Sequence, residues 1–380
     1  MNTKKVLIGF LAGTTAVAAT ICIFGYGYIF KALRINLKKG PLTPSTDDEE
    51  KFPSNPVSNF KQKPWQKHSD YNKKQLSSTL LEELEKTNAS SLVVIKNNKI
   101  IHEQYWKDHD PSSLMNSFSM AKGILSILTG FAIDDGYLDS EDQLVSSVFP
   151  QYSESKYGKY LTFKHLMTMQ AGFDWEEEYN HPFAENSKQY FVDDLAEQTF
   201  KTEIKEMPGE KYQYQSVAPQ LLGLALRKVT GKSLADYLSE KIWRPLGMES
   251  VAKWSTDEKG MEKAFCCIHA IPRDFAKIGQ LILQNGNWEG KQLIDQKYCE
   301  KLLHPTPEND AFCYNVWADN ESKIKLRFFY GFLGQFIIMI PSENIIIVKT
   351  GIYNRLDVDQ KKRPLQVKIL AEEICSIFSD

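Results

Sequence analysis

The sequence predicts an α+β protein in which an antiparallel sheet is flanked by helices and carries an inserted all-α lobe, behind an N-terminal transmembrane helix. Two β-rich runs near residue 95 are followed by a long block of helical periodicity, and the chain then returns to further β-rich runs and a closing helix. Ahead of this body, 25 residues contain no acidic or basic side chain. The order of these elements indicates one body with two lobes, and a cleft between lobes is the expected place for a site.

The N-terminal apolar stretch, residues 6–30, has the length of a membrane span. About 20 apolar residues cross the hydrocarbon layer, whereas a cleavable signal peptide has an apolar run of about 7 to 15. We therefore expect residues 1–30 to be an uncleaved single-pass anchor, with cleavage after Ala16-Val17-Ala18 as the alternative. The basic residues Lys4 and Lys5 before the stretch and Lys31 after it leave its orientation open.

The next segment, residues 31–75, is rich in proline and contains the acidic run Asp47 to Glu50. Such a composition buries too little apolar surface to fold by itself, so it is predicted to be a linker. Residues 76–380 remain as the folded body. We expect an α/β lobe from residues 76–118 and 260–380, with residues 119–259 forming the helical lobe.

The helices and strands of the body are predicted from the spacing of apolar residues and from the turn residues between them. The first two strands are predicted over residues 91–95 and 99–105, because the intervening Asn97-Asn98 is typical of a hairpin turn. Apolar residues at three- and four-residue spacing predict helices over residues 120–134, 162–170, 217–230, 234–243 and 273–284. Further strands are predicted over residues 328–330, 335–340 and 345–350, and a last helix over residues 364–378.

Charge and cysteine content exclude several classes of protein. The chain has 46 basic and 48 acidic side chains and a formal charge of −2, so no general field attracts nucleic acid, and we expect no such partner. Its six cysteines contain no C-x-x-C pair, and adjacent Cys266 and Cys267 are not expected to bridge one another. We expect mostly buried thiols, no metal site and no cofactor.

The strongest local signal is Ser119-Met120-Ala121-Lys122 at the start of a predicted helix. Three residues along a helix place Ser119 and Lys122 on one face, within reach of each other. A lysine near apolar walls can have its pKa lowered enough to take the serine proton. The start of the helix also supplies free N–H groups that can stabilise an oxyanion.

A second motif, Lys211-Tyr212-Gln213-Tyr214-Gln215-Ser216, follows in the same lobe. A third block, Arg244-Pro245-Leu246-Gly247-Met248, comes next, and Asp274 to Leu281 adds a fourth. Together with Asn116 to Lys122 these blocks make residues 76–378 resemble the serine β-lactamase and penicillin-binding-protein superfamily. The best likeness is to its class C branch, which includes esterases and 6-aminohexanoate-dimer hydrolases.

This resemblance implies a β-lactamase/transpeptidase-like fold and a role for each motif residue. Ser119 corresponds to the acyl-accepting nucleophile, Lys122 to its base and Tyr214 to the tyrosine of the second motif. A phenol beside an ammonium group can have its pKa depressed, and it can pass a proton to the leaving group. Ser216 stands where the family commonly has asparagine, and it keeps a hydrogen-bond donor for substrate.

The third motif departs further from the family. A literal Lys349-Thr350-Gly351 is present, but it ends the second strand of the late hairpin, whereas the family triad precedes the first. The matching place holds Phe329-Tyr330-Gly331, which resembles the W-x-G form of esterase-like relatives and contains no cation. Lys325 and Arg327 nearby are the alternative cations for a substrate carboxylate. Gly331 and Phe332 are therefore predicted to border the substrate, with the backbone N–H near Phe332 and that of Ser119 forming an oxyanion hole.

The predicted function is a serine hydrolase that forms an acyl-enzyme with a small ester, amide or peptide substrate. The alternatives are a penicillin-binding D,D-peptidase or β-lactamase, and a non-catalytic membrane-anchored sensor of the same fold. The resemblance places the body outside the cytoplasmic membrane, in the periplasm, while the oligomeric state stays open. The acidic run Asp174 to Glu178 is expected to be a solvated loop, with a place at the border of the cleft as the alternative.

Overall fold

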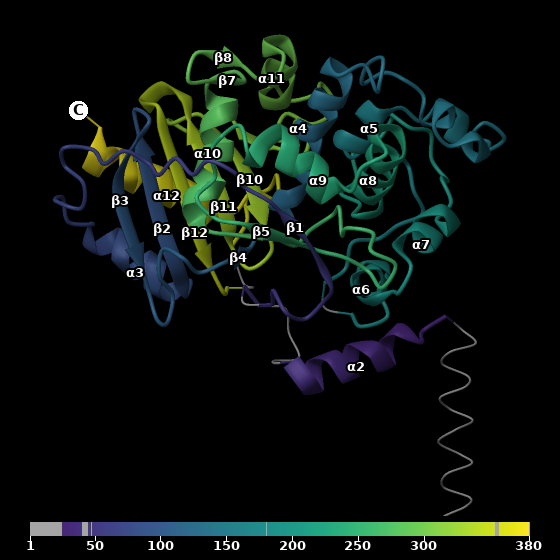
Figure 1. Cartoon of the computed structure of the whole chain (residues 1–380), viewed down its shortest axis with the longest axis horizontal. Coiled ribbons are helices and arrows are strands. Elements are labelled where there is room, and N and C mark those ends of the chain that lie inside the picture. Colours follow the sequence, from purple (N-terminus) through teal and green to yellow (C-terminus); the bar gives the residue numbers. More distant parts are fainter. Residues whose placement is uncertain (1–24, 40–44, 47, 180, 354–356, 380) are drawn as a thin grey trace, which may run out of the picture.

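The computed structural model describes residues 25–39, 45–46, 48–179, 181–353 and 357–379. The part of the predicted anchor over residues 6–24 lies outside them. Within the described ranges, no helix combines the length and the apolar character that a membrane crossing requires. The first described helix is α2 (Tyr28–Lys39), which lies apart from the sheets, below the body in the view of Figure 1.

The larger sheet has six strands in the order β3-β2-β12-β11-β10-β9, and every neighbouring pair is antiparallel. The strands are β2 (Ala89–Lys96), β3 (Lys99–Tyr105), β9 (Trp317–Asp319), β10 (Leu326–Gly331), β11 (Gln335–Ile340) and β12 (Ile345–Gly351). The chain enters this sheet as the hairpin β2–β3 and returns to it only after the helical lobe. This connection confirms the antiparallel sheet flanked by helices.

Both faces of the larger sheet are covered, because its central strands are apolar on both sides. Val93 and Ile95 join one core cluster with the helix α10 (Pro272–Leu283), whereas Leu92 and Val94 join a second cluster with α12 (Leu365–Phe378). The helix α3 (Ser78–Lys86) also packs on β2 and α12. The larger sheet therefore lies between two layers of helices, with α10 on one face and α12 on the other (Figure 1).

The helical lobe lies between β4 (Met115–Asn116) and β5 (Ala252–Ser255) in sequence. Its main helices are α4 (Met120–Asp134), α5 (Phe163–Met167), α6 (Glu185–Phe191), α7 (Leu195–Lys201), α8 (Val217–Thr230) and α9 (Leu234–Leu238), which continues into the π-helical turn η4 (Ser239–Trp243). Short 3₁₀ turns occur at η1 (Val145–Ser147), η2 (Pro150–Tyr152) and η3 (Gly158–Tyr160). Helix α4 is buried along nearly its whole length and packs against both α8 and β10, so it joins the two lobes.

Several elements complete the C-terminal half of the chain. They are the small hairpin β7 (Asn287–Trp288) and β8 (Lys291–Gln292), the helix α11 (Gln296–Leu303), which packs on α4, and the 3₁₀ turn η5 (Pro341–Glu343). The turn η5 joins β11 to β12, and Asn344 after it has a φ of 48°, in the left-handed region that asparagine tolerates. The late hairpin of the sequence prediction is therefore β11–β12.

A second sheet, in the order β1-β5-β6-β4, includes a strand from the segment predicted to be a linker. Its edge strand β1 (Ser54–Val57) comes from the proline-rich segment and pairs with β5, and β6 (Ile268–Ala270) joins β5 to β4. Phe52 and Val57 are buried, and the backbone N–H of Asn116 donates to Thr46 O at 3.1 Å. The segment packs because residues of the body supply the apolar partners that it lacks by itself.

Candidate active site

Ser119 lies where β4 gives way to α4, at the N-cap of the helix. The small sheet fixes the approach, since Ser117 N donates to Ile268 O at 2.8 Å and Ile268 N donates to Ser117 Oγ at 3.0 Å. Phe118, directly before the serine, has a φ of 42°, in the left-handed region that residues other than glycine rarely adopt. Such backbone conformations concentrate at functional sites. The Ser119 side chain is partly exposed and open to a substrate.

Lys122 lies one turn along α4 and is buried. Its ammonium donates to Ser119 Oγ at 2.8 Å and to Phe265 O at 2.9 Å. Burial lowers the pKa of Lys122 to about 8, and the charge of Glu177 acts in the opposite direction. The three-residue spacing thus brings the two side chains together as predicted. At neutral pH the amine is partly deprotonated, so it can accept a proton.

Tyr214 lies on the other side of Lys122, whose Nζ is 5.0 Å from the centre of the tyrosine ring. Burial raises the pKa of Tyr214 well above its usual value, the charge of Glu177 raises it further, and a hydrogen bond with Ser119 lowers it. The depressed phenol pKa that the sequence suggested is therefore wrong, because loss of solvent around the ring and the charge of Glu177 outweigh the hydrogen bond with Ser119. The phenol stays protonated and can donate a hydrogen bond.

Glu177 is the residue that sequence reasoning missed. Its Oε1 accepts from Ser216 Oγ at 2.6 Å and from Tyr179 OH at 2.8 Å. Its Oε2 accepts from Ser216 N at 2.9 Å and from Trp175 Nε1 at 2.8 Å. The acidic run is thus not wholly a solvated loop. A signal was present, because Trp175, Glu177 and Tyr179 alternate and such spacing puts side chains on one side of an extended segment.

The hydroxyl of Ser216 is engaged within the protein. Ser216 stands at the N-cap position of α8, which begins at Val217, but its hydroxyl donates to Glu177 and makes no capping bond to the helix. Ser216 still lines the cavity with Ser119 and Lys122. The negative charge of Glu177, which Ser216 binds, raises the pKa of both Lys122 and Tyr214.

Gly331 and Phe332 lie at the end of β10, opposite the serine. A Cβ atom on Gly331 would come within 2.2 Å of Ser117 O, so only glycine lets this strand approach the loop before Ser119 so closely. The Phe332 ring lies against Phe118, with centroids 5.8 Å apart, and stacks on Tyr179 at 5.2 Å. Phe332 lines the cavity with Ser119.

The literal Lys349-Thr350-Gly351 lies inside the larger sheet and does not line this cavity. Lys349 is buried, its ammonium donates to Gly334 O at 3.2 Å, and burial lowers its pKa to about 7. Thr350 shares a hydrogen bond of 2.6 Å with Ser91. The triad thus supports the sheet.

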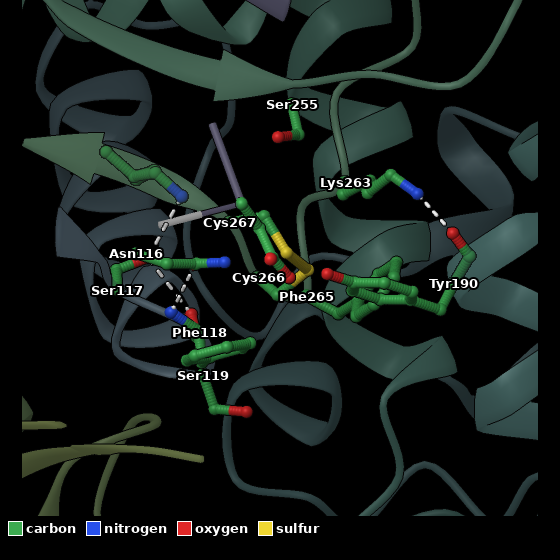
Figure 2. The surroundings of a disulfide bond; sticks show 12 residues. Asn116, Ser117, Phe118, Ser119, Tyr190, Ser255, Lys263, Phe265, Cys266 and Cys267 are labelled. Atoms are coloured by element: carbon green, nitrogen blue, oxygen red, sulfur yellow. Dashed lines mark hydrogen bonds between the residues drawn. A yellow bond between two sulfur atoms is a disulfide. The ribbon is translucent and has the colours of Figure 1, made fainter. Parts of the chain in front are cut away.

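Cys266 and Cys267 form a disulfide bond, contrary to the sequence expectation (Figure 2). The two side chains converge because Cys267 has a φ of 73°, which turns the backbone sharply between Phe265 and β6. The carbonyl that receives the Lys122 ammonium belongs to Phe265, next to this disulfide. Among the described residues the other cysteines, Cys299, Cys313 and Cys375, are buried thiols.

The cavity above Ser119 has a volume of about 420 Å³. Side chains from α2, from the segment 177–191 and from Phe118, Phe265 and Phe332 line it. Apart from Lys122, the lysine along its wall is Lys51, which forms an ion pair with Asp48 at 2.9 Å. No group of His, Cys, Asp and Glu in the described part of the chain is arranged to hold a metal ion.

Comparison with known proteins agrees with this geometry. The family model described as Beta-lactamase matches residues 78–363. The chain belongs to the β-lactamase family. Members of this family are hydrolases, such as the 6-aminohexanoate-dimer hydrolase of Paenarthrobacter ureafaciens, which is 24% identical over 234 residues. That match covers 59% of this chain and 59% of the relative, so the chain spans about three-fifths of that protein's length.

Solved structures of this family share the fold. A Bacillus anthracis protein named for the 6-aminohexanoate-dimer hydrolase activity superposes with a TM-score of 0.73 at 21% identity, covering 87% of this chain and 92% of that one. A class C β-lactamase from Rhodobacter sphaeroides superposes with a TM-score of 0.57 at 15% identity, covering 80% of this chain and all of that one. The family resemblance seen in the motifs is thereby confirmed.

Proposed function

We propose that this chain is a serine hydrolase that cleaves an ester or amide through an acyl-enzyme on Ser119. The observation that carries the proposal is the 2.8 Å contact between Lys122 Nζ and Ser119 Oγ, made by a lysine whose pKa burial lowers to about 8. A neutral amine there takes the hydroxyl proton as Oγ attacks the substrate carbonyl. Membership of a hydrolase family supports the reaction class.

The remaining steps use the neighbouring groups. The backbone N–H groups of Ser119 and Phe332 stabilise the oxyanion of the tetrahedral intermediate. Tyr214 donates its proton to the leaving alcohol or amine as the carbon–heteroatom bond breaks. Tyr214 is then reprotonated by the proton that Lys122 has taken from Ser119. Water then attacks the Ser119 ester, giving the carboxylic acid and restoring the serine hydroxyl.

The substrate group beside Ser119 is uncharged or carries no carboxylate that needs a cation. The support is the place of Lys349 inside the sheet and the pairing of Lys51 with Asp48. The proposal thus favours an esterase or amidase over a penicillin-binding D,D-peptidase or β-lactamase.

The test is active-site labelling of the full-length chain in detergent with a fluorophosphonate, followed by peptide mass spectrometry. We expect the adduct on Ser119, its loss in Ser119→Ala and Lys122→Met, and its retention in the matched control Lys349→Met. Turnover of p-nitrophenyl acetate should follow the label. Label on another residue would contradict the assignment. Nitrocefin hydrolysis faster than ester hydrolysis would favour a β-lactamase. Binding of a ligand without hydrolysis of any ester, peptide or lactam would favour a sensor.

We propose further that the apolar residues 6–24, which precede the described part of the chain, anchor the protein in the cytoplasmic membrane with the body on its outer side. The support is the length of the apolar stretch and the family resemblance. Alkaline phosphatase fused to the C-terminus should be active in intact cells. An inactive phosphatase fusion, together with fluorescence from a green fluorescent protein fused at the same place, would locate the body inside the cell.

A further inference from the structure

The roof of the cavity over Ser119 is helix α2. Tyr28, Ile29, Ala32 and Leu33 of this helix line the same cavity as Ser119. The space between them, about 420 Å³, is within the range of small-molecule sites. The walls that lead from the serine to α2 are mainly aliphatic and aromatic side chains.

Helix α2 is held on the body by polar contacts at its N-terminal end. Lys31 forms ion pairs with Asp193 at 2.5 Å and with Glu258 at 2.8 Å. The hydroxyl of Tyr28 donates to Pro182 O at 2.8 Å. These contacts place α2 beside α6 at the lower side of the body (Figure 1) and keep its apolar face over the cavity.

We propose that this cavity is an acyl-chain subsite, so that the substrate is an amphiphile whose scissile ester or amide carries a chain of several methylene groups. This inference rests on the proposed serine hydrolase function. An apolar chain fits because the charged groups in the wall are already engaged: Lys122 with Ser119, Glu177 with Ser216, and Lys51 with Asp48. Each buried methylene should raise kcat/KM about fourfold until the cavity is full.

The outward face of α2 agrees with such a substrate. Phe30 and Leu37 are 40% and 81% exposed, and their seven-residue spacing puts them along one stripe of the helix. Arg34 and Lys38 are exposed beside this stripe. An apolar stripe flanked by basic side chains suits the surface of an anionic membrane, where amphiphiles are concentrated.

The test compares p-nitrophenyl acetate, butyrate and octanoate, each below its micellar concentration, with the full-length chain. The variant is Ala32→Phe, which fills the cavity from the roof, and the matched control is Leu37→Phe on the exposed side of α2. We expect wild-type kcat/KM to increase with chain length. Ala32→Phe should lower it at least tenfold for octanoate through KM, while acetate changes less than twofold and Leu37→Phe leaves both unchanged.

Three results would overturn the subsite: no dependence on chain length, equal loss for acetate and octanoate in Ala32→Phe, or higher activity on both esters, which would make α2 an inhibitory lid. Failure of the proposed function looks different, because then even acetate is not turned over and Ser119 is not labelled.

A second inference comes from the turn that carries the disulfide. This turn, residues 262–268, presents Phe265 O to Lys122 and Ile268 to Ser117, so it contacts the base and the loop of the nucleophile together. Buried groups hold its other side, since Ala264 N donates to Gln220 Oε1 at 2.9 Å and the Lys263 ammonium donates to Tyr190 O (Figure 2).

We infer that the Cys266–Cys267 disulfide is a positioning element for Lys122, so that hydrolysis depends on its oxidised state. Cys267 occupies the left-handed region, which a side-chain-bearing residue leaves readily when nothing holds it there. A dithiol that reaches Cys266 through the cavity supplies two electrons and two protons; it becomes a disulfide, and the two cysteines become thiols. The turn then relaxes, and Phe265 O moves away from the ammonium.

The experiment combines reduction with two double variants. Dithiothreitol should lower wild-type kcat several-fold with little change in KM, and mass spectrometry should show the gain of two hydrogens. Cys266→Ala with Cys267→Gly should stay within about threefold of wild type, because glycine accepts the left-handed conformation. Cys266→Ala with Cys267→Ala should lose at least tenfold in kcat.

A readout specific to Lys122 separates positioning from general loss of structure. Loss of the Phe265 acceptor destabilises the ammonium form, so the acid limb of kcat/KM should move to lower pH in the alanine pair but not in the glycine pair. Unchanged kcat after complete reduction, or equal losses in both pairs, would overturn the inference.

Discussion

The substitution Glu177→Gln tests how the site sets the protonation of Lys122. Because burial lowers the pKa of Lys122 to about 8, about one tenth of the amine is neutral at pH 7 and about one hundredth at pH 6. The base must be neutral to act, so wild-type kcat/KM should fall about tenfold per pH unit below pH 8. The charge of Glu177 raises the pKa of Lys122. Its removal should therefore move this limb to lower pH.

The hydrogen bonds of Glu177 allow the substitution to be nearly isosteric. A glutamine oxygen can accept from the two N–H donors, Ser216 N and Trp175 Nε1, which share Oε2 in the wild type. Its amide can donate to the hydroxyls of Ser216 and Tyr179, which can rotate to accept. The change is then mainly one of charge, and the folded structure should be retained.

The assay is the pH dependence of kcat/KM for p-nitrophenyl acetate between pH 5.5 and about pH 9.5, where the free enzyme titrates. Glu176→Gln, an exposed neighbour, removes the same charge and should leave the limb in place. At pH 6 the Glu177→Gln variant should keep a larger fraction of its plateau activity than wild type. A limb that moves to higher pH, or a wild-type limb well below pH 7, would refute the assignment of Lys122 as the base.

Three further substitutions test other parts of the site. Gly331→Ala should destabilise the fold by roughly 1–3 kcal/mol in urea unfolding and lower kcat, because the new Cβ meets Ser117 O at 2.2 Å; unchanged kcat would show that β10 need not approach the loop. Ser216→Ala should cost about 1 kcal/mol and raise KM, because Glu177 loses a 2.6 Å bond; the check is thermal unfolding beside steady-state kinetics. Lys349→Met should leave kcat/KM within about twofold, whereas a hundredfold loss would make that lysine part of the site.

Elements with strong local periodicity were predictable from the sequence. The helices over residues 120–134 and 217–230 and the strands over residues 99–105 and 335–340 match α4, α8, β3 and β11 residue for residue. Apolar spacing and flanking glycine or asparagine signals determine these boundaries. The pairing of Ser119 with Lys122 was predictable for the same reason, since a helix fixes the separation of residues three apart.

What escaped prediction depends on partners far away in the sequence. Strand β1 has little β-propensity of its own and becomes a strand only because β5 offers an edge. Glu177 accepts hydrogen bonds from Ser216 only when the loop folds back on α8. The Cys266–Cys267 bond needs the left-handed backbone at Cys267, which composition does not reveal.

The small sheet also limits where this chain can be cut to obtain a soluble enzyme. A fragment starting after residue 60 lacks β1 and leaves the edge of β5 unpaired. It also lacks Thr46, whose carbonyl receives the N–H of Asn116, three residues before Ser119. Shortened forms should therefore begin before Ser45, because the N-terminal segment is hydrogen-bonded directly to the loop that leads to Ser119.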